Sequence, residues 1–231
     1  MSKSILLFGS IGTIVESSEI QRRAYGQALR EAGLAWQWDE PVYRELLLQS
    51  GGRDRLAMLG AATGQPLSAA RIAQIHTRKT ELACAEIAAT RPALRPGVAE
   101  LMALAAARGW KRGFVTSTEQ ANIDAVLALD PAVARGQFDV VIGRADVQHG
   151  KPHPQAFETA LNRLGGRPAD AIAIEDTASS VMAAVRAGIT TVAVPGAFAS
   201  EQDFWQADLV IPALADARGV LDPRVLALIG Q

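Results

Sequence analysis

The sequence predicts an α/β fold in which a doubly wound parallel sheet carries an inserted helical domain. Six short apolar runs alternate with segments of helical periodicity along most of the 231-residue chain. Such alternation is typical of parallel strands joined by right-handed crossovers. Between the first two runs, one long stretch shows helical periodicity alone. Because a crossover needs only about a dozen residues, the longer stretch indicates a separate domain.

The first predicted strand covers residues 5–8 and is apolar throughout. The later apolar runs are equally short and end at small or polar residues, which favours strands buried on both faces over free-standing helices. These later strands are predicted at 113–116, 138–142, 171–174, 191–194 and 209–211. Together they form a Rossmann-like core domain, which we place at residues 1–14 and 97–231.

Helices are predicted both in the insertion and between the later strands. Those of the insertion cover 18–32, 41–48, 54–62 and 68–89, which places the inserted domain with its linkers at 15–96. Those of the core cover 98–108, 119–129, 154–164 and 178–187. Glycines follow three of the core helices, as expected because glycine accepts the left-handed conformation that ends a helix.

Composition argues against several classes of protein. A net charge of −1 with 20% charged residues argues against a nucleic-acid partner. No apolar run approaches the ~20 residues of a membrane span, so we expect no membrane association. The single cysteine, Cys84, excludes an internal disulfide and paired-cysteine metal sites. It fits the reducing cytoplasm, where we expect the protein to be, and no protein partner is indicated.

Polar residues follow three of the later predicted strands at their carboxyl ends. Thr116 and Ser117 end the second strand, Lys151 follows the third, and Glu175 and Asp176 end the fourth. In parallel sheets a ligand lies outside the carboxyl ends of the strands, so we expect these side chains to converge. Hydroxyl and ammonium groups suit phosphate oxygens, and paired carboxylates suit Mg²⁺.

The first strand ends in a loop with two glycines, Gly9 and Gly12. One interpretation is a dinucleotide fingerprint, in which glycines let the backbone approach a pyrophosphate. The third glycine of that motif is absent, and a helical insertion follows in place of a short helix and a second strand. A tight turn is the simpler alternative, and the other strand ends favour a phosphate and metal site.

The ordered set of strand-end motifs resembles the haloacid dehalogenase superfamily over essentially the whole chain, and the insertion resembles its C1-type cap. Within the superfamily the chain is most similar to sugar-bisphosphate phosphatases of the CbbY type and to β-phosphoglucomutases. Supporting segments are 43–47, 51–55, 79–81, 93–97 and 174–176. The resemblance implies a phosphatase that uses Mg²⁺ and binds a small phosphorylated metabolite.

In this family the first strand ends in a motif with two aspartates, and the resemblance implies a role for each. The first attacks phosphorus and ligates Mg²⁺, and the second is the general acid and base. Alignment on Phe8, Gly12 and Thr13 puts the first role at Gly9 and the second at Ile11. Neither residue can form a phospho-enzyme or transfer a proton, so we expect turnover by the family mechanism to be lost.

The missing carboxylates also change the predicted ligands. Glu175 and Asp176 remain as metal ligands, but without the bridging aspartate we predict weak or absent Mg²⁺ binding. The phosphate-binding residues that remain are Gly12, Thr13, Thr116, Ser117 and Lys151. Because two negative charges are gone, we hypothesise that Lys151 allows phosphate to bind without a metal.

Glycines and cations of the insertion resemble the substrate loop and cap cations of the family. They are Gly51, Gly52, Arg53, Arg55, Lys79 and, in the return linker, Arg95. In a bisphosphate-binding relative such groups would hold the distal phosphate. We favour this interpretation because a glycine pair followed by arginines suits phosphate. The alternative is surface ion pairs with Asp54, Glu81 or Glu45, which would contribute little stability.

A few more polar residues near the predicted site have structural alternatives. Gln21 and Gln155 stand where relatives often have histidine and aspartate, respectively. Ser10 is the nearest substitute nucleophile, but strand alternation points it away from the side of residues 9 and 11, and no histidine is adjacent. His149 and His153 could touch substrate, although an exposed loop histidine is more often solvated.

The aromatic residues and the cysteine of the insertion are predicted to be structural. Trp36, Trp38 and Tyr43 cluster in the sequence, and core packing explains them best because buried aromatics carry a large apolar area. Cys84 lies on the last predicted helix of the insertion, where we expect a small buried hydrophobe.

Three classes of function remain open on the sequence. The first is a degenerate phosphatase that binds a phosphorylated sugar without turnover. The second is an active hydrolase with a non-standard nucleophile, and the third is an interaction protein with a vestigial cleft. We favour the first because the nucleophile and the acid/base are missing, whereas Lys151, Glu175 and Asp176 are retained.

Overall fold

The computed structural model describes residues 3–36, 38–49 and 51–230 of the chain. In these ranges a six-stranded sheet has the order β3-β2-β1-β4-β5-β6 with every adjacent pair parallel. The strands are β1 (Ile5–Phe8), β2 (Lys111–Val115), β3 (Val140–Ile142), β4 (Ala171–Glu175), β5 (Thr190–Ala193) and β6 (Leu209–Val210). The predicted doubly wound α/β fold is therefore confirmed, and the strand order reverses between β1 and β4.

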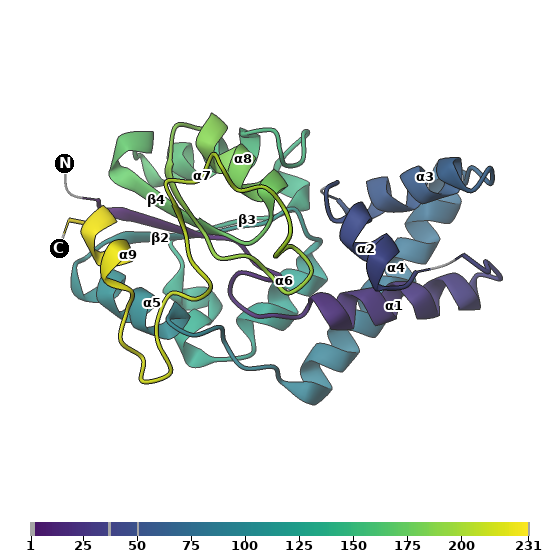
Figure 1. Cartoon of the computed structure of the whole chain (residues 1–231), viewed down its shortest axis with the longest axis horizontal. Coiled ribbons are helices and arrows are strands. Elements are labelled where there is room, and N and C mark those ends of the chain that lie inside the picture. Colours follow the sequence, from purple (N-terminus) through teal and green to yellow (C-terminus); the bar gives the residue numbers. More distant parts are fainter. Residues whose placement is uncertain (1–2, 37, 50, 231) are drawn as a thin grey trace.

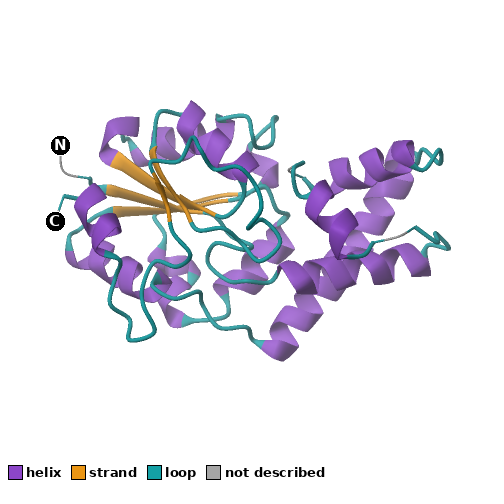
Figure 2. Ribbon diagram, in the orientation of Figure 1, coloured by secondary structure: helices purple, strands orange, loops and turns teal. Residues whose placement is uncertain are grey.

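Helices cover both faces of the sheet, because successive side chains of a strand point to opposite sides. Leu6 and Phe8 of β1 belong to one hydrophobic cluster, and Ile5 and Leu7 belong to another. The first cluster is covered by α5 (Val98–Ala107), α6 (Gln120–Leu127) and α9 (Pro223–Leu228). The second is covered by α7 (Gln155–Leu164) and α8 (Ala178–Arg186). Figure 2 shows the strands between these two helical layers.

The observed elements that correspond to predicted ones begin and end within two residues of them. The C-terminal helix α9 was not predicted from the sequence. Short 3-10 helices occupy several loops, at Pro131–Val133, Arg135–Gln137, Arg144–Asp146 and Pro168–Asp170. They were not predicted, because segments of three residues leave no periodicity in a sequence.

The insertion between β1 and α5 is helical, as predicted, and its helices lie together at one end of the sheet (Figure 1). They are α1 (Ser18–Glu31), α2 (Glu40–Leu46), α3 (Gly52–Ala62) and α4 (Ala69–Thr90). We call this group the helical segment. Its core holds Tyr25, Trp38 and Tyr43, with Tyr25 and Trp38 stacked at a centroid distance of 4.5 Å. Trp36 packs against the same core while staying partly exposed.

Two connections join the helical segment to the sheet, and they lie side by side. Val15 in the first connection bridges to Leu94 in the second, and the Arg95 amide donates to the Ile14 carbonyl at 2.9 Å. In the first connection, Glu16 accepts hydrogen bonds from the amides of Ser18 and Ala197. Both connections are thus tied to the loops at the carboxyl end of the sheet.

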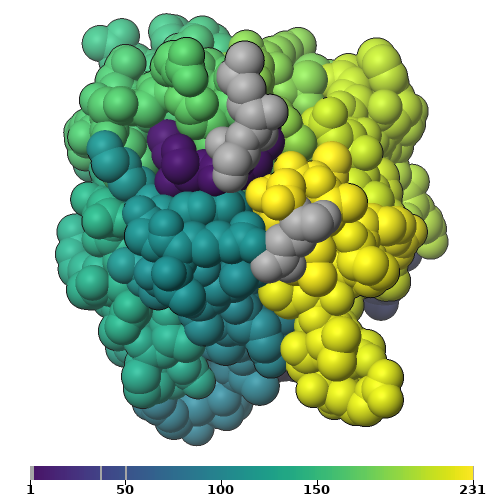
Figure 3. Space-filling model, turned by 90° about the vertical axis from the view of Figure 1, so that its left-hand side faces the viewer, coloured from purple at the N-terminus to yellow at the C-terminus, as the bar shows by residue number. Residues whose placement is uncertain are grey.

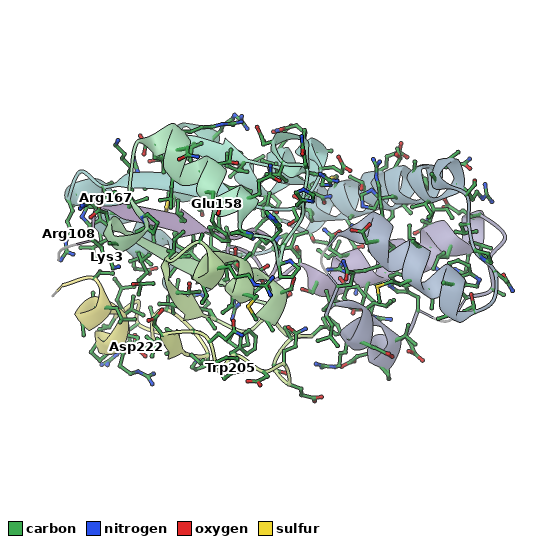
Figure 4. All side chains as sticks on the ribbon, turned by 90° about the horizontal axis from the view of Figure 1, so that it is seen from above. Lys3, Arg108, Glu158, Arg167, Trp205 and Asp222 are labelled. Carbon is green, nitrogen blue, oxygen red and sulfur yellow. The ribbon has the colours of Figure 1, made fainter. Side chains whose placement is uncertain are left out.

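The other end of the sheet, where β1 begins, is held by contacts of the N-terminal segment. In Figure 3, which views this end, the N-terminal segment is enclosed by later parts of the chain. Lys3, Arg108 and Arg167 lie here, far from the helical segment (Figure 4). The Lys3 ammonium donates to the Ala169 carbonyl and to the Thr190 hydroxyl. The carboxyl end of β1 therefore points toward the helical segment.

Candidate functional site

A pocket lies between the carboxyl end of the sheet and the helical segment. The predicted site residues of the sheet side that line it are Ile11, Thr116, Ser117, Lys151, Glu175 and Asp176. Those of the helical side are Gly51, Gly52, Arg55 and Lys79. The fold thus brings together most of the residues that the sequence singled out, although they are up to 165 positions apart.

On the sheet side, Lys151 and Glu175 form a buried ion pair. The Lys151 Nζ lies 2.5 Å from Glu175 Oε1 and 3.1 Å from the Val115 carbonyl, and it also faces the ring of Phe157 at 5.0 Å. The Lys151 and Glu175 side chains are 4% and 1% exposed. Burial raises the pKa of Glu175, and the nearby ammonium of Lys151 opposes that shift. The charge of Lys151 is therefore partly neutralised within the protein.

The Glu175 carboxylate occupies the space beside Gly9. A Cβ atom at position 9 would collide with Glu175 Oε2 and would lie 2.6 Å from the Thr13 hydroxyl oxygen. Such a contact forces a neighbour to move. Position 9, where the family resemblance puts a nucleophile, thus has no room for a side chain in this arrangement.

Asp176 is the second buried carboxylate of the sheet side. Its Oδ1 accepts a hydrogen bond from the Thr13 hydroxyl at 3.0 Å. Burial, followed by the charge of Glu175, raises the pKa of Asp176 to about 7. At neutral pH this group is therefore divided between its protonated and ionised forms.

The carboxylates of Glu175 and Asp176, as arranged here, do not fit a Mg²⁺ site. Magnesium requires near-octahedral oxygen coordination, usually built on carboxylates that are free to ligate. Glu175 is paired with Lys151, Asp176 with Thr13, and position 9 has no side-chain oxygen to offer. Within the described ranges, His, Cys, Asp and Glu side chains form no group of three that could hold a metal.

The loop after β1 forms a turn that is closed by its own backbone hydrogen bonds. The Gly12 amide donates to the Val15 carbonyl at 2.8 Å, and the Thr13 amide donates to the Ser10 carbonyl at 3.2 Å. Both amides are thus bonded within the turn, and the expectation that Gly12 and Thr13 hold phosphate stays a prediction. Thr116 and Lys151 line the pocket, and the Thr116 Oγ1 is bonded to the amide and hydroxyl of Thr118.

On the helical side, Lys79 is buried against neutral groups. Its ammonium donates to Gln21 Oε1 and lies 4.6 Å from the ring centroid of Tyr25. Gln21 in turn donates to Asn122 Oδ1 of α6 at 3.3 Å. Burial, followed by the charge of Arg55, lowers the pKa of Lys79 to about 7. At neutral pH Lys79 is therefore divided between its ammonium and its neutral amine form, and its hydrogen-bond partner is uncharged.

Close packing explains the glycine at position 52. A Cβ there would collide with the Tyr25 hydroxyl and would lie 2.5 Å from His76 Nε2. Burial, followed by the charge of Lys79, lowers the pKa of His76 to about 3, so this imidazole is neutral. Gly51 has a φ of 94°, which favours glycine. Both glycines thus have structural reasons that the sequence did not reveal.

The three arginines assigned to substrate binding have different surroundings. Arg55 lines the pocket, and its Nε donates to the Gln49 carbonyl at 2.8 Å. Arg53 forms an ion pair with Glu119 at 3.1 Å, and not with the partners considered from the sequence. Neither Arg53 nor Arg95 is part of the pocket lining, although Arg53 lies between the lining residues Gly52 and Arg55.

The Arg95 guanidinium holds the second connection against the sheet with its covering helices and loops, which we call the sheet domain. It donates to four backbone carbonyls, those of Gly12, Val194, Pro195 and Pro212. Burial lowers its pKa. The hydrogen-bonding groups of Arg95 therefore face the backbone of three loops, and the expectation that Arg95 binds substrate stays a prediction.

The remaining candidates are also placed. The Ser10 hydroxyl is buried, lines the pocket and has no hydrogen-bond partner, so no base activates it. His149 and His153 are exposed and lie outside the pocket lining, with their rings 4.8 Å apart. Gln155 accepts from the amides of residues 148 and 149. Cys84 is half-buried, with Sγ 3.8 Å from Asn122 Oδ1, and burial raises its pKa.

Sequence analysis missed several residues that line the pocket. They include Tyr25, His76, Glu119, Asn122 and Phe198. For His76 a signal existed, since it lies one helical turn before Lys79 and shares its face. No helix in the described ranges is long and apolar enough to cross a membrane.

A family model described as haloacid dehalogenase-like hydrolase matches residues 5–188. Protein CbbY of Rhodobacter capsulatus is 35% identical over 218 residues, which cover 94% of this chain and 96% of the relative. Protein CbbY of Cereibacter sphaeroides is 36% identical over 217 residues, covering 93% and 94%.

Solved structures are similar as well. CbbY from Rhodobacter sphaeroides, in complex with phosphate, has a TM-score of 0.86 and 33% identity, covering 95% of this chain and 99% of the other. An aspartate-to-asparagine mutant of CbbY from the same source, in complex with xylulose-(1,5)bisphosphate, has the same score and identity, covering 96% and 100%. A β-phosphoglucomutase from Clostridium difficile is 19% identical with a TM-score of 0.78, which supports the fold alone.

Proposed function

Because the chain belongs to the haloacid dehalogenase-like hydrolases, as a homologue of CbbY-type phosphatases, we propose that its pocket binds a phosphorylated sugar without hydrolysing it by the family mechanism. The observation that carries this proposal is at the carboxyl end of β1. Gly9 and Ile11 provide no carboxylate there, and the Glu175 side chain fills the space beside Gly9. Covalent phosphoryl transfer requires a nucleophile, and proton transfer requires an acid or base.

Binding is supported by the cations that remain around the pocket. Lys79 and Arg55 line the helical side, and Lys151 lines the sheet side. Ammonium and guanidinium groups in a partly dehydrated pocket are suited to phosphate oxygens. The similar CbbY structures contain phosphate and xylulose-(1,5)bisphosphate, which supports a ligand of this class.

We also propose that binding is independent of Mg²⁺. Lys151 stands within the carboxylate group in which the family places its metal, and it already balances the charge of Glu175. The helical segment with its connections, residues 15–96, is proposed to act as a cap domain on a core of residues 1–14 and 97–231. Closure of such a cap would shield the ligand from water.

The test combines a binding measurement with a turnover measurement. Xylulose-(1,5)bisphosphate is titrated into the wild-type protein by calorimetry, with Mg²⁺ and with a chelator, and phosphate release is followed in parallel beside an active CbbY protein. We expect binding under both conditions and no release. Release at the rate of the active relative would contradict the proposal, and absence of binding would favour an interaction protein with a vestigial cleft.

A Gly9→Asp/Ile11→Asp variant separates the two halves of the proposal. If the pocket is intact and only the reacting groups are missing, this variant gains slow Mg²⁺-dependent release. The gain is expected to be small, because Glu175 has to move before an aspartate at position 9 can be accommodated. The Lys79→Met variant, in contrast, is expected to lose affinity and to leave the absence of release unchanged.

A further inference from the structure

An ion pair connects the helical segment with the sheet domain at the mouth of the pocket. Arg53, near the beginning of α3, lies 3.1 Å from the carboxylate of Glu119, which immediately precedes α6. Glu119 lines the pocket, as do Gly52 on one side of Arg53 and Arg55 two residues beyond it. Among the ion pairs within the described residues, this pair alone joins the helical segment to the sheet domain.

The partners of this pair are accessible to a ligand. The Arg53 side chain is 52% exposed and that of Glu119 is 33% exposed, so neither group is locked in the interior. An exposed ion pair is weak, typically worth a factor of about five or less in an equilibrium constant. A phosphate dianion, which carries more charge and more acceptor oxygens than a carboxylate, can therefore displace Glu119 from the guanidinium.

We propose that Glu119 is a specificity-determining residue that competes with a ligand for Arg53. This inference rests on the proposed function and deepens it by assigning the ligand charge that the pocket prefers. A ligand with one phosphate binds at the cations that line the pocket, Lys79, Arg55 and Lys151, and leaves the Arg53–Glu119 pair intact. A ligand with a second phosphate gains Arg53 only by breaking that pair, and it must also tolerate the freed carboxylate of Glu119 beside it.

The structure offers a matched control. Arg23 and Glu86 form an ion pair between α1 and α4, with side-chain exposures of 52% and 31% that nearly equal those of Arg53 and Glu119. Neither residue lines the pocket between the sheet and the helical segment. Glu86→Gln therefore removes a carboxylate of nearly the same exposure that is also paired with an arginine of the helical segment, and it does so away from the pocket.

The experiment compares the affinities for a bisphosphate and a monophosphate, and its readout is the ratio of the two. Xylulose-(1,5)bisphosphate and xylulose 5-phosphate are titrated by calorimetry into wild type, Glu119→Gln, Arg53→Gln, the double variant and Glu86→Gln at low ionic strength. In Glu119→Gln we expect the ratio of bisphosphate to monophosphate affinity to rise about fivefold. Glu86→Gln leaves the ratio at the wild-type value. In the Arg53→Gln background the Glu119→Gln change loses most of its effect.

Other outcomes overturn the inference in distinguishable ways. Suppose that both sugars bind but Glu119→Gln changes their affinities by the same factor. Glu119 then acts only through the overall electrostatic potential of the pocket, and the proposed role in specificity is wrong. The same holds if the effect persists in full without Arg53, or if Glu86→Gln reproduces it. If neither sugar binds any of the five proteins, the proposed function itself falls, and this inference falls with it.

Discussion

On the sheet side of the pocket the ammonium of Lys151 is paired with the carboxylate of Glu175, whereas on the helical side the ammonium of Lys79 is hydrogen-bonded to the neutral amide of Gln21. The two walls thus hold their lysines in different ways, one against a negative charge and the other against a neutral dipole. An anion that enters the pocket would compete with the Glu175 carboxylate for Lys151, but with no carboxylate for Lys79.

The largest expected effect concerns the charge balance of the sheet wall. Lys151→Met and Glu175→Gln are each expected to lower the free energy of unfolding by about 3–5 kcal/mol, because each leaves a buried group without its partner. The double variant should be less destabilised than the sum of the two single variants. Chemical denaturation measures all three. If the single losses simply add, the two walls do not differ in the way described.

Arg95→Met is expected to lower the free energy of unfolding by about 2–3 kcal/mol, because four carbonyls lose their shared donor. The affinity for xylulose-(1,5)bisphosphate should stay unchanged, since Arg95 does not line the pocket. Denaturation and calorimetry on the same preparation check both statements. A loss of affinity at full stability would instead restore Arg95 to the binding wall.

Gly9→Ala tests how tightly the sheet side of the pocket is packed around position 9. The added methyl group meets the Glu175 carboxylate, and overpacking here is expected to cost about 1–2 kcal/mol of unfolding free energy. Gly136→Ala is the control, because a Cβ at position 136 meets nothing within 4 Å. Thermal or chemical denaturation should therefore separate the two variants, and equal stability would show that position 9 is open.

The effect that is smallest per measured step concerns pH and the helical wall. The pKa of Lys79 is about 7 in the folded chain and 10.5 ordinarily, so between these values the unfolded chain holds more protons. The contribution of Lys79 to stability therefore rises with pH in this window, by up to about 1.4 kcal/mol per pH unit. Denaturation at several pH values should show this slope in wild type and in Lys111→Met, but not in Lys79→Met. An unchanged slope in Lys79→Met would refute the assignment.

Much of the fold was predictable, because buried parallel strands and capped helices leave clear periodicity. The strand ends placed Thr116, Lys151, Glu175 and Asp176 correctly at one edge of the sheet. The hydrogen-bond and ion-pair partners of the charged side chains were not predictable, since they depend on distances across the fold. Arg95 has the same charge as Arg55, yet only the structure separates the residue that holds backbone carbonyls from the one that lines the pocket. Nothing in the sequence identifies Glu119 as the partner of Arg53.

The space beside Gly9 also constrains how this chain can change over time. Its volume is occupied by the Glu175 carboxylate, which is itself paired with Lys151. An aspartate introduced at position 9 alone would enter occupied space and disturb a buried ion pair. A single substitution here is therefore expected to destabilise the fold before it adds any chemistry. Catalysis by the family mechanism would require positions 9, 11 and 175 to change together.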